Sequence, residues 1–252
     1  MPLSPLSNFG RVSRRLPQAQ ADANEAEERV SPYGDQHIIA VSATKHVLVD
    51  EGSYVCSTNP TVSTGVAYGS GASQASFSDT VAFMVWYNGW SPNDPNARRM
   101  YLDYLRLIVG GTVPTGPTSV QCAIKIDNGN RAPTANSTLT TPVNANLSVG
   151  TVNGRHWVPN AGTITVPASV NARLIERFSI RHAIPVVADE YRINFGSIDG
   201  TAVSQSGIGF FKTNCVPVVL NPGDYCVFHL WFSGTATANP FTVEYVSTWW
   251  ER

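Results

Sequence analysis

Apolar and polar residues alternate along most of the chain from about residue 37 onward, and no apolar stripe repeats at helical spacing over the length of a helix. A period of two is the pattern of a half-buried strand, whereas an amphipathic helix repeats every 3.6 residues. Ten segments carry the strand pattern: 37–41, 45–49, 80–87, 99–109, 120–127, 173–184, 191–195, 210–220, 225–232 and 241–250. The sequence therefore predicts an all-β protein.

Turn-forming residues close most of these segments. Gly110 and Gly111 follow one strand, Asp-Asn-Gly-Asn at 127–130 follows another, and Asn-Pro-Gly-Asp at 221–224 joins two late strands. Such residues supply the turn conformations that strands need at their ends. About ten strands of unequal length with long loops favour an antiparallel β-sandwich of jelly-roll type, in which two sheets close around one core.

The segment 173–184 shows the alternation in detail. One of its faces is apolar and consists of Leu174, Phe178, Ile180 and Ile184. The other face is polar and consists of Arg173, Arg177, Ser179 and Arg181. Successive side chains of a strand point to opposite sides of the sheet, so we expect the first set to face the core. We expect the three arginines to form a stripe that contacts acidic groups of a neighbouring subunit.

The carboxy-terminal segment alternates in the same way and then ends in two adjacent tryptophans, Trp249 and Trp250. Large rigid aromatic side chains contribute most energy in a core or at a subunit interface. We therefore expect this pair to fill the end of the core or an interface between subunits.

Residues 1–36 differ from the remainder and predict an extended N-terminal arm before a sandwich domain over 37–252. Arg11, Arg14 and Arg15 make the first part of the arm basic, but four basic residues are outnumbered by five acidic ones over its length. Neutralising a nucleic acid normally takes a dense basic block. We therefore expect these arginines to dock the arm on a neighbouring subunit, without strong binding to nucleic acid.

The segment from about 131 to 167 is poor in charge and rich in Thr, Asn, Ala and Pro. Its short alternations predict small hairpins in a loop excursion on the outside of the sandwich. Long loops of this kind often carry function or contact a partner.

Composition narrows the classes of function. Only 14% of the residues are charged and the formal net charge is -1, which removes the broad attraction to phosphate backbones or anionic membranes. No apolar run is long enough for a transmembrane helix, and the amino terminus has no continuous apolar segment of signal-peptide length. The sequence favours a protein that is made in the cytoplasm and does not bind membranes.

The sequence contains no motif for catalysis. Its five histidines stand in no ligand or nucleophile motif, and its 18 acidic residues include no pair that a motif singles out for glycoside hydrolysis. Residues 127–130 resemble a calcium loop but lack the distal glutamate. The cysteines, at 56, 122, 215 and 226, are too far apart for a metal motif, so we expect mostly buried free thiols. We expect no enzyme activity, cofactor or metal.

Several stretches resemble virion structural proteins of tailed bacteriophages, in particular the β-sandwich or jelly-roll proteins of the capsid. The resemblance covers 80–90, 100–131, 177–196, 221–234 and the terminal Ser-Thr-Trp-Trp-Glu-Arg. It implies a capsid decoration, or cement, protein located in the virion. Its partners would be the major capsid protein and further copies of itself, as a homotrimer. The resemblance transfers no catalytic or ligand-binding residue.

Two alternatives stay open at this point. A major capsid protein with a single jelly roll would use the same fold together with an amino-terminal arm. A receptor-binding or carbohydrate-binding protein at a vertex or tail would use exposed tryptophans and the 131–167 segment.

Overall fold

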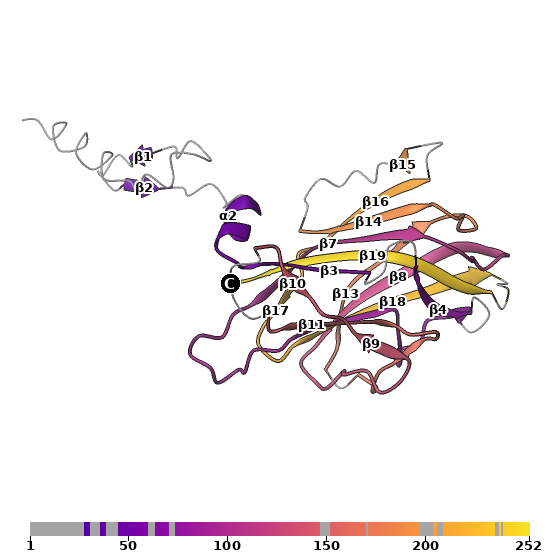
Figure 1. Ribbon diagram of the computed structural model, residues 1–252, viewed down its shortest axis with the longest axis horizontal. Helices are drawn as coiled ribbons and strands as arrows, with labels where there is room; N and C mark the ends of the chain where they lie inside the picture. Colours follow the sequence, from indigo (N-terminus) through magenta and orange to yellow (C-terminus); the bar gives the residue numbers. More distant parts are fainter. Residues whose placement is uncertain are drawn as a thin grey trace, which may run out of the picture. The chain divides into compact units, whose positions relative to one another are not determined.

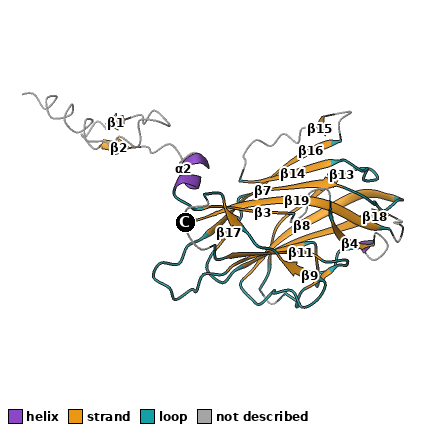
Figure 2. Ribbon diagram, viewed as in Figure 1, coloured by secondary structure: helices purple, strands orange, loops and turns teal. Residues whose placement is uncertain are grey.

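The computed structural model describes residues 28–30, 36–38, 45–59, 64–70, 74–146, 152–169, 171–196, 204–205, 209–234, 237 and 239–252 (Figures 1 and 2). Residues 1–50 and 51–252 form separate compact units. The second unit contains two large sheets and a small two-stranded pair.

The first unit contains the antiparallel pair β1 (Glu28–Val30) and β2 (Gln36–Ile38) and the helix α2 (Lys45–Asp50). The strand predicted over 45–49 is therefore wrong, because an apolar run this short has no readable period and fits either element. The predicted strand 37–41 overlaps β2, and its residues 39–41 lie outside the described residues. Arg11, Arg14 and Arg15 also lie outside them.

The larger sheet of the second unit has nine strands. Its main path runs in the order β10 (Val143–Asn144), β3 (Tyr54–Thr58), β19 (Pro240–Glu251), β7 (Met100–Val109), β14 (Glu190–Phe195), β16 (Phe210–Cys215) and β15 (Ser204–Gln205). Beside this path, β17 (Val219–Leu220) pairs with β7 and β4 (Val66–Ser70) pairs with β19. The β14–β16 pair is parallel, and the other pairs are antiparallel.

The second sheet has six strands, in the order β13 (Arg173–Arg181), β8 (Pro117–Asp127), β18 (Tyr225–Gly234), β6 (Met84–Asn88), β11 (Gly154–Pro159) and β9 (Ser137–Leu139). A separate two-stranded pair consists of β12 (Ile164–Thr165) and β5 (Val81–Ala82). Figure 2 shows that strands make up most of this unit.

The main core lies between the two sheets. Leu105 and Leu107 of β7 and Tyr191 of β14 meet Phe228 and Phe232 of β18 in one buried cluster. A second, smaller cluster on the other face of the six-stranded sheet consists of Ala82, Val85, Ile164, Val166, Tyr225 and Val227. Strand β18 is therefore buried on both faces, because β5 and β12 form an additional layer over this part of the sheet. The expected all-β sandwich is confirmed.

The eight long-range strands of the sandwich pair in a nested order. In chain order they are β3, β6, β7, β8, β13, β14, β18 and β19. The first pairs with the last, the second with the seventh, the third with the sixth and the fourth with the fifth, each time antiparallel. These four strand pairs are then joined two by two. Pairing of β19 with β7 completes one sheet, and pairing of β18 with β8 completes the other.

The segment 131–167 differs from the expected excursion. Strands β9 and β11 extend the six-stranded sheet, and β10 extends the nine-stranded sheet. The segment is thus part of both sheets. Its strands are short, so their alternation is too brief to be distinguished from a loop rich in Thr, Asn and Pro.

Strand β13 departs from the predicted alternation because its register shifts twice, between Leu174 and Glu176 and again between Ser179 and Arg181. Each bulge inserts a residue and reverses the faces that follow. Ile180 is buried as predicted, but Leu174 is 57% exposed and Ile184, beyond the strand, is 44% exposed. The prediction that these two face the core is wrong.

Candidate functional site

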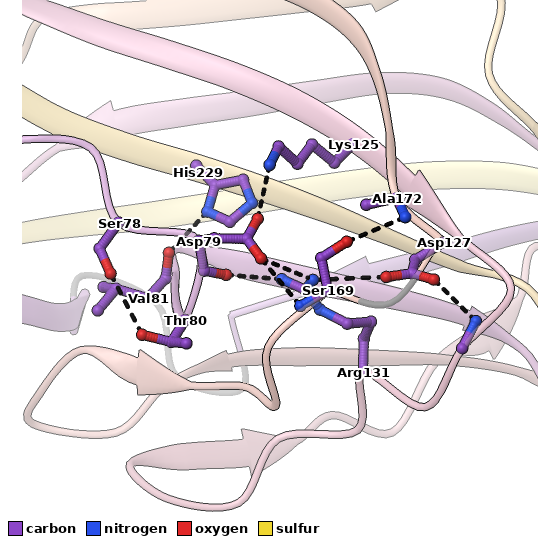
Figure 3. A network of polar contacts seen from close by, with 11 residues as sticks. Ser78, Asp79, Thr80, Val81, Lys125, Asp127, Arg131, Ser169, Ala172 and His229 are labelled. Carbon is purple, nitrogen blue, oxygen red and sulfur yellow. Dashed lines mark hydrogen bonds and ion pairs between the residues drawn. The ribbon is translucent and has the colours of Figure 1, made fainter.

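The most connected group of charged side chains lies on the outer face of the six-stranded sheet (Figure 3). Its centre is Arg131, in the connection after β8, whose side chain is only 1% exposed. The Nη1 atom lies 3.2 Å from Oδ2 of Asp79 and 3.4 Å from Oδ2 of Asp127, and Nη2 donates a hydrogen bond of 2.6 Å to the backbone carbonyl of Asp79. The guanidinium thus bridges two carboxylates from different parts of the chain.

Asp79 is the second hub of this network. Lys125 of β8 places Nζ 2.6 Å from its Oδ1, and the backbone N–H of Ser169 donates to its Oδ2 at 2.9 Å. Partial burial on its own would raise the Asp79 pKa. The hydrogen bonds from Lys125 and Ser169 and the charge of Arg131 outweigh burial and lower the pKa to about 2. The Asp79 carboxyl group is therefore ionised in the folded protein at neutral pH.

An aromatic group continues the network along β18. The Nδ1 atom of His229 lies 2.7 Å from the carbonyl oxygen of Val81, so Nδ1 is protonated and donates a hydrogen bond to that oxygen. Phe77 packs edge-on against His229 and Trp231, and Lys125 lies over its ring. Burial lowers the pKa of His229 to about 4, which keeps the imidazole neutral at physiological pH.

Three loop segments that are far apart in the sequence are attached by this network to one face of the six-stranded sheet. Residues 77–81, residues 128–131 and the pair Ser169 and Ala172 are held there through Asp79, Arg131 and Ser169. Arg131 and Asp127 are each 1% exposed, whereas the side chains of Lys125 and Asp79 are 18% and 28% exposed, so one end of the network is buried and the other reaches the surface. We call the ion pairs among Asp79, Lys125, Asp127 and Arg131 the ionic clamp, because they attach these loop segments to the outer face of the sheet. Sequence reasoning missed it because its members are separated by 46 and 52 residues.

The predicted arginine stripe is broken by the two bulges of β13. Residues directly opposite each other in an antiparallel pair share a face. Arg177 pairs with Ala123, but Arg173 and Arg181 pair with Ile126 and Val120, whose side chains face the opposite side of β8. The prediction that the three arginines share one face is therefore wrong.

The three arginines also differ in their contacts. Arg173 and Arg177 are exposed, and Arg177 lies over the ring of Trp231. Arg181 is only 13% exposed and forms an ion pair of 2.7 Å with Asp189. Arg181 therefore has a partner inside the chain, whereas a role of Arg173 and Arg177 at an interface stays a prediction.

The two terminal tryptophans are placed differently. Trp249 is fully buried and donates its Nε1–H to Glu251, so it is a core residue of this chain. Trp250 is half-buried and stacks on Tyr101, with ring centroids 5.5 Å apart and an interplanar angle of 6°. Of this predicted pair, only Trp250 has a surface that a partner could contact.

A buried serine and histidine, Ser57 of β3 and His156 of β11, link the two sheets. The Ser57 hydroxyl lies 2.9 Å from Nδ1 of His156 and donates to the hydroxyl of Thr140, also at 2.9 Å. Burial lowers the pKa of His156 to about 3, so its ring is neutral. Ser57 and His156 are 99 residues apart, and no sequence signal connects them.

Two large cavities are among those that open on the described surface. One, of about 820 Å³, is bordered by polar residues that include Asn128, Asn171, Arg173 and Asp224. The other, of about 640 Å³, lies between β3, β4 and β19 of one sheet and β9 and β11 of the other. Among the described residues, no three His, Cys, Asp or Glu side chains are grouped to hold a metal ion, and no helix is long and apolar enough to cross a membrane.

Comparison with known proteins gives no match to a protein-family model, to a curated protein or to a solved structure.

Proposed function

We propose that the protein is a structural subunit of a virus particle, built on a single jelly roll and able to form the shell itself. The observation that carries the proposal is the nested pairing of the eight sandwich strands. The first strand pairs with the last, the second with the seventh and so on inward, and this nested order supports the proposal of a jelly roll, in which two Greek keys form two packed sheets. Viral capsid subunits are a principal use of this architecture.

The division of the chain supports the same proposal. Residues 1–50 form one compact unit and residues 51–252 another. This division suits a protein in which the first unit contacts a neighbouring copy while the sandwich acts as a rigid block. The ionic clamp contributes to this rigidity, because it fixes long connections to a sheet face. Rigid blocks with additional contact segments are suited to repeated, symmetric assembly.

The tryptophans weigh against the carbohydrate-binding alternative. All six lie in the described part of the chain, and each is buried or half-buried: Trp86, Trp90, Trp157, Trp231, Trp249 and Trp250. A sugar-binding platform needs the face of an aromatic ring to be open. The indole rings of this chain mainly pack within the sandwich.

The decisive experiment is assembly of the purified full chain without any other protein. We expect electron microscopy and sedimentation velocity to show closed particles of uniform size when ionic strength and pH are varied. A small oligomer that never closes into particles, but binds preformed shells at a saturable ratio, would replace the proposal with the decoration function. A chain that does neither would overturn both.

A variant pair tests the edge strand β13 in this assembly. Strand edges with free backbone groups are natural sites for contact between chains. Replacing Arg173 and Arg177 together by Glu should reduce particle formation, whereas Arg155→Glu, at another exposed arginine on the six-stranded sheet, should not. Equal assembly of both variants would remove the β13 edge from the interface.

A further inference from the structure

The cavity between the two sheets has features of a ligand site that the proposed shell function does not use. Its volume is about 640 Å³, within the range of about 300–1,000 Å³ that small-molecule pockets occupy. Strands β3, β4 and β19 form one wall, and β9 and β11 form the opposite wall. A molecule bound there would touch both sheets.

Apolar and neutral polar side chains both line the walls, and the mouth exposes two large apolar side chains. Val66, Ala67 and Val158 line the cavity, and Leu139 and Val143 border it with 50% and 51% of their surface exposed. Exposed large apolar side chains at a concave surface often mark a binding site. These two belong to β9 and β10, which lie on opposite sheets.

The described lining contains no charged side chain. An ionised ligand would lose its hydration there without gaining a counter-charge, which is costly. Polar contacts come from neutral groups, such as the hydroxyls of Thr58, Thr138 and Thr141. The lining therefore selects against carboxylates, phosphates and ammonium groups.

Tyr245 supplies an independent observation. It lines the cavity, it is only 2% exposed, and its hydroxyl has no partner within normal hydrogen-bond geometry. Burial raises the pKa of Tyr245, and the nearby Ser57 side chain partly offsets this. Buried polar atoms normally have a partner, so an unsatisfied phenol on a residue that lines a cavity requires an explanation. A ligand hydroxyl or carbonyl would satisfy the phenol.

We propose that this cavity binds a neutral small molecule that has an apolar part and one hydroxyl or carbonyl group, which hydrogen-bonds to Tyr245. The apolar part packs against Val66, Ala67 and Val158. Because the molecule contacts both sheets, its binding stabilises the folded sandwich by mass action. This site is independent of whether the protein forms shells.

The test is a titration of the full-length protein with the neutral fluorescent probe 1-aminoanthracene, followed by displacement. We expect saturable binding of one probe per chain. 1-Octanol should displace the probe at a concentration at least about tenfold lower than octanoate or octyltrimethylammonium, because the charged groups would be buried without partners. Absence of saturable binding, or equal displacement by all three compounds, would overturn the proposal.

The alkylation rate of the Cys56 thiol tests whether 1-octanol binds in this cavity. Cys56 lines the cavity and is partly exposed, whereas the thiols of Cys122, Cys215 and Cys226 are buried. 1-Octanol should therefore slow the alkylation of Cys56 by N-ethylmaleimide, measured by mass spectrometry. An unchanged alkylation rate at saturating octanol would place the alcohol elsewhere and refute this site.

Two variants and a matched control complete the experiment. Ala67→Phe fills the cavity and should abolish probe binding, whereas Ala172→Phe, at a half-exposed alanine that borders the other cavity, should not. Tyr245→Phe keeps the ring and should weaken octanol binding by about three- to tenfold, the loss expected for one hydrogen bond. If Ala67→Phe does not fold, undiminished octanol binding by Tyr245→Phe is sufficient to reject the assigned hydrogen bond.

Discussion

Mild acid should destabilise the folded sandwich through two buried histidines. His156 and His229 are 0% and 1% exposed, and burial lowers their pKa values from 6.5 to about 3 and about 4. Between these values and 6.5 the unfolded chain binds protons that the folded chain does not. The stability that each neutral imidazole contributes is therefore fully present above about pH 6.5 and decreases as the pH falls toward the folded pKa.

The magnitude follows from the two shifts. One pKa unit corresponds to about 1.4 kcal/mol. At about pH 5 each histidine therefore lowers the free energy of unfolding by about 2 kcal/mol relative to neutral pH, and the two together lower it by about 4 kcal/mol. This is a large part of the 5–15 kcal/mol or so by which folded domains are normally stable. Asp79, whose pKa is lowered to about 2, adds its own loss only below about pH 4. The window between about pH 6.5 and pH 5 therefore isolates the histidines.

The assay is urea denaturation of the unassembled chain, followed by tryptophan fluorescence at several pH values in this window. The limiting slope should be about 2.7 kcal/mol per pH unit, and about half of that in either His156→Asn or His229→Asn. Asparagine keeps a donor near the position of Nδ1 and cannot titrate. His182→Asn, at an exposed histidine, should keep the parent slope. A parent slope below about 0.5 kcal/mol per pH unit, or no change in both buried variants, would refute the reasoning.

Three further outcomes are expected from stability measurements. Arg131→Met should lower the free energy of unfolding by about 3–5 kcal/mol, because it leaves carboxylates without their buried partner, whereas Met at the exposed Arg99 should be nearly neutral. Ile180→Ala should cost about 2–5 kcal/mol and Leu174→Ala less than about 0.5 kcal/mol, and similar costs would contradict the bulged register of β13. Deleting residues 1–50 should leave a cooperatively folding sandwich by circular dichroism and thermal melting, and loss of cooperative unfolding would contradict the division into two units.

The ionic clamp and the second hydrophobic cluster explain why the outer side of β18 in the six-stranded sheet is buried. An exposed sheet face usually alternates between buried and solvated residues. Strand β18 does not, because β5, β12 and the clamp connections cover its outer side. The additional layer turns a two-layer sandwich into a locally three-layered one, and its attachment depends on the contacts of Arg131 Nη1 and Nη2 with Asp79 and Asp127.

The sequence by itself determined the fold class and most of the long strands. In β7, β14 and β19 an apolar residue recurs at nearly every second position, and these segments are strands whose inner faces form the core. This information is local, because side-chain period depends only on backbone geometry. The apolar run in the predicted strand 45–49 is too short to show a period, so the sequence does not distinguish a strand there from the helix α2.

Only the tertiary structure decided which strands pair and what lies beside what. The bulges of β13 depend on its pairing with β8, and they separated three arginines that the alternation places on one face. Asp79, Lys125, Arg131 and Ser169 carry no shared motif, yet the fold brings them within hydrogen-bonding distance. The cavity beside Tyr245 likewise exists only because the fold places residues from both sheets around it. These features depend on contacts between distant segments, and a local pattern of hydrophobicity does not encode such contacts individually.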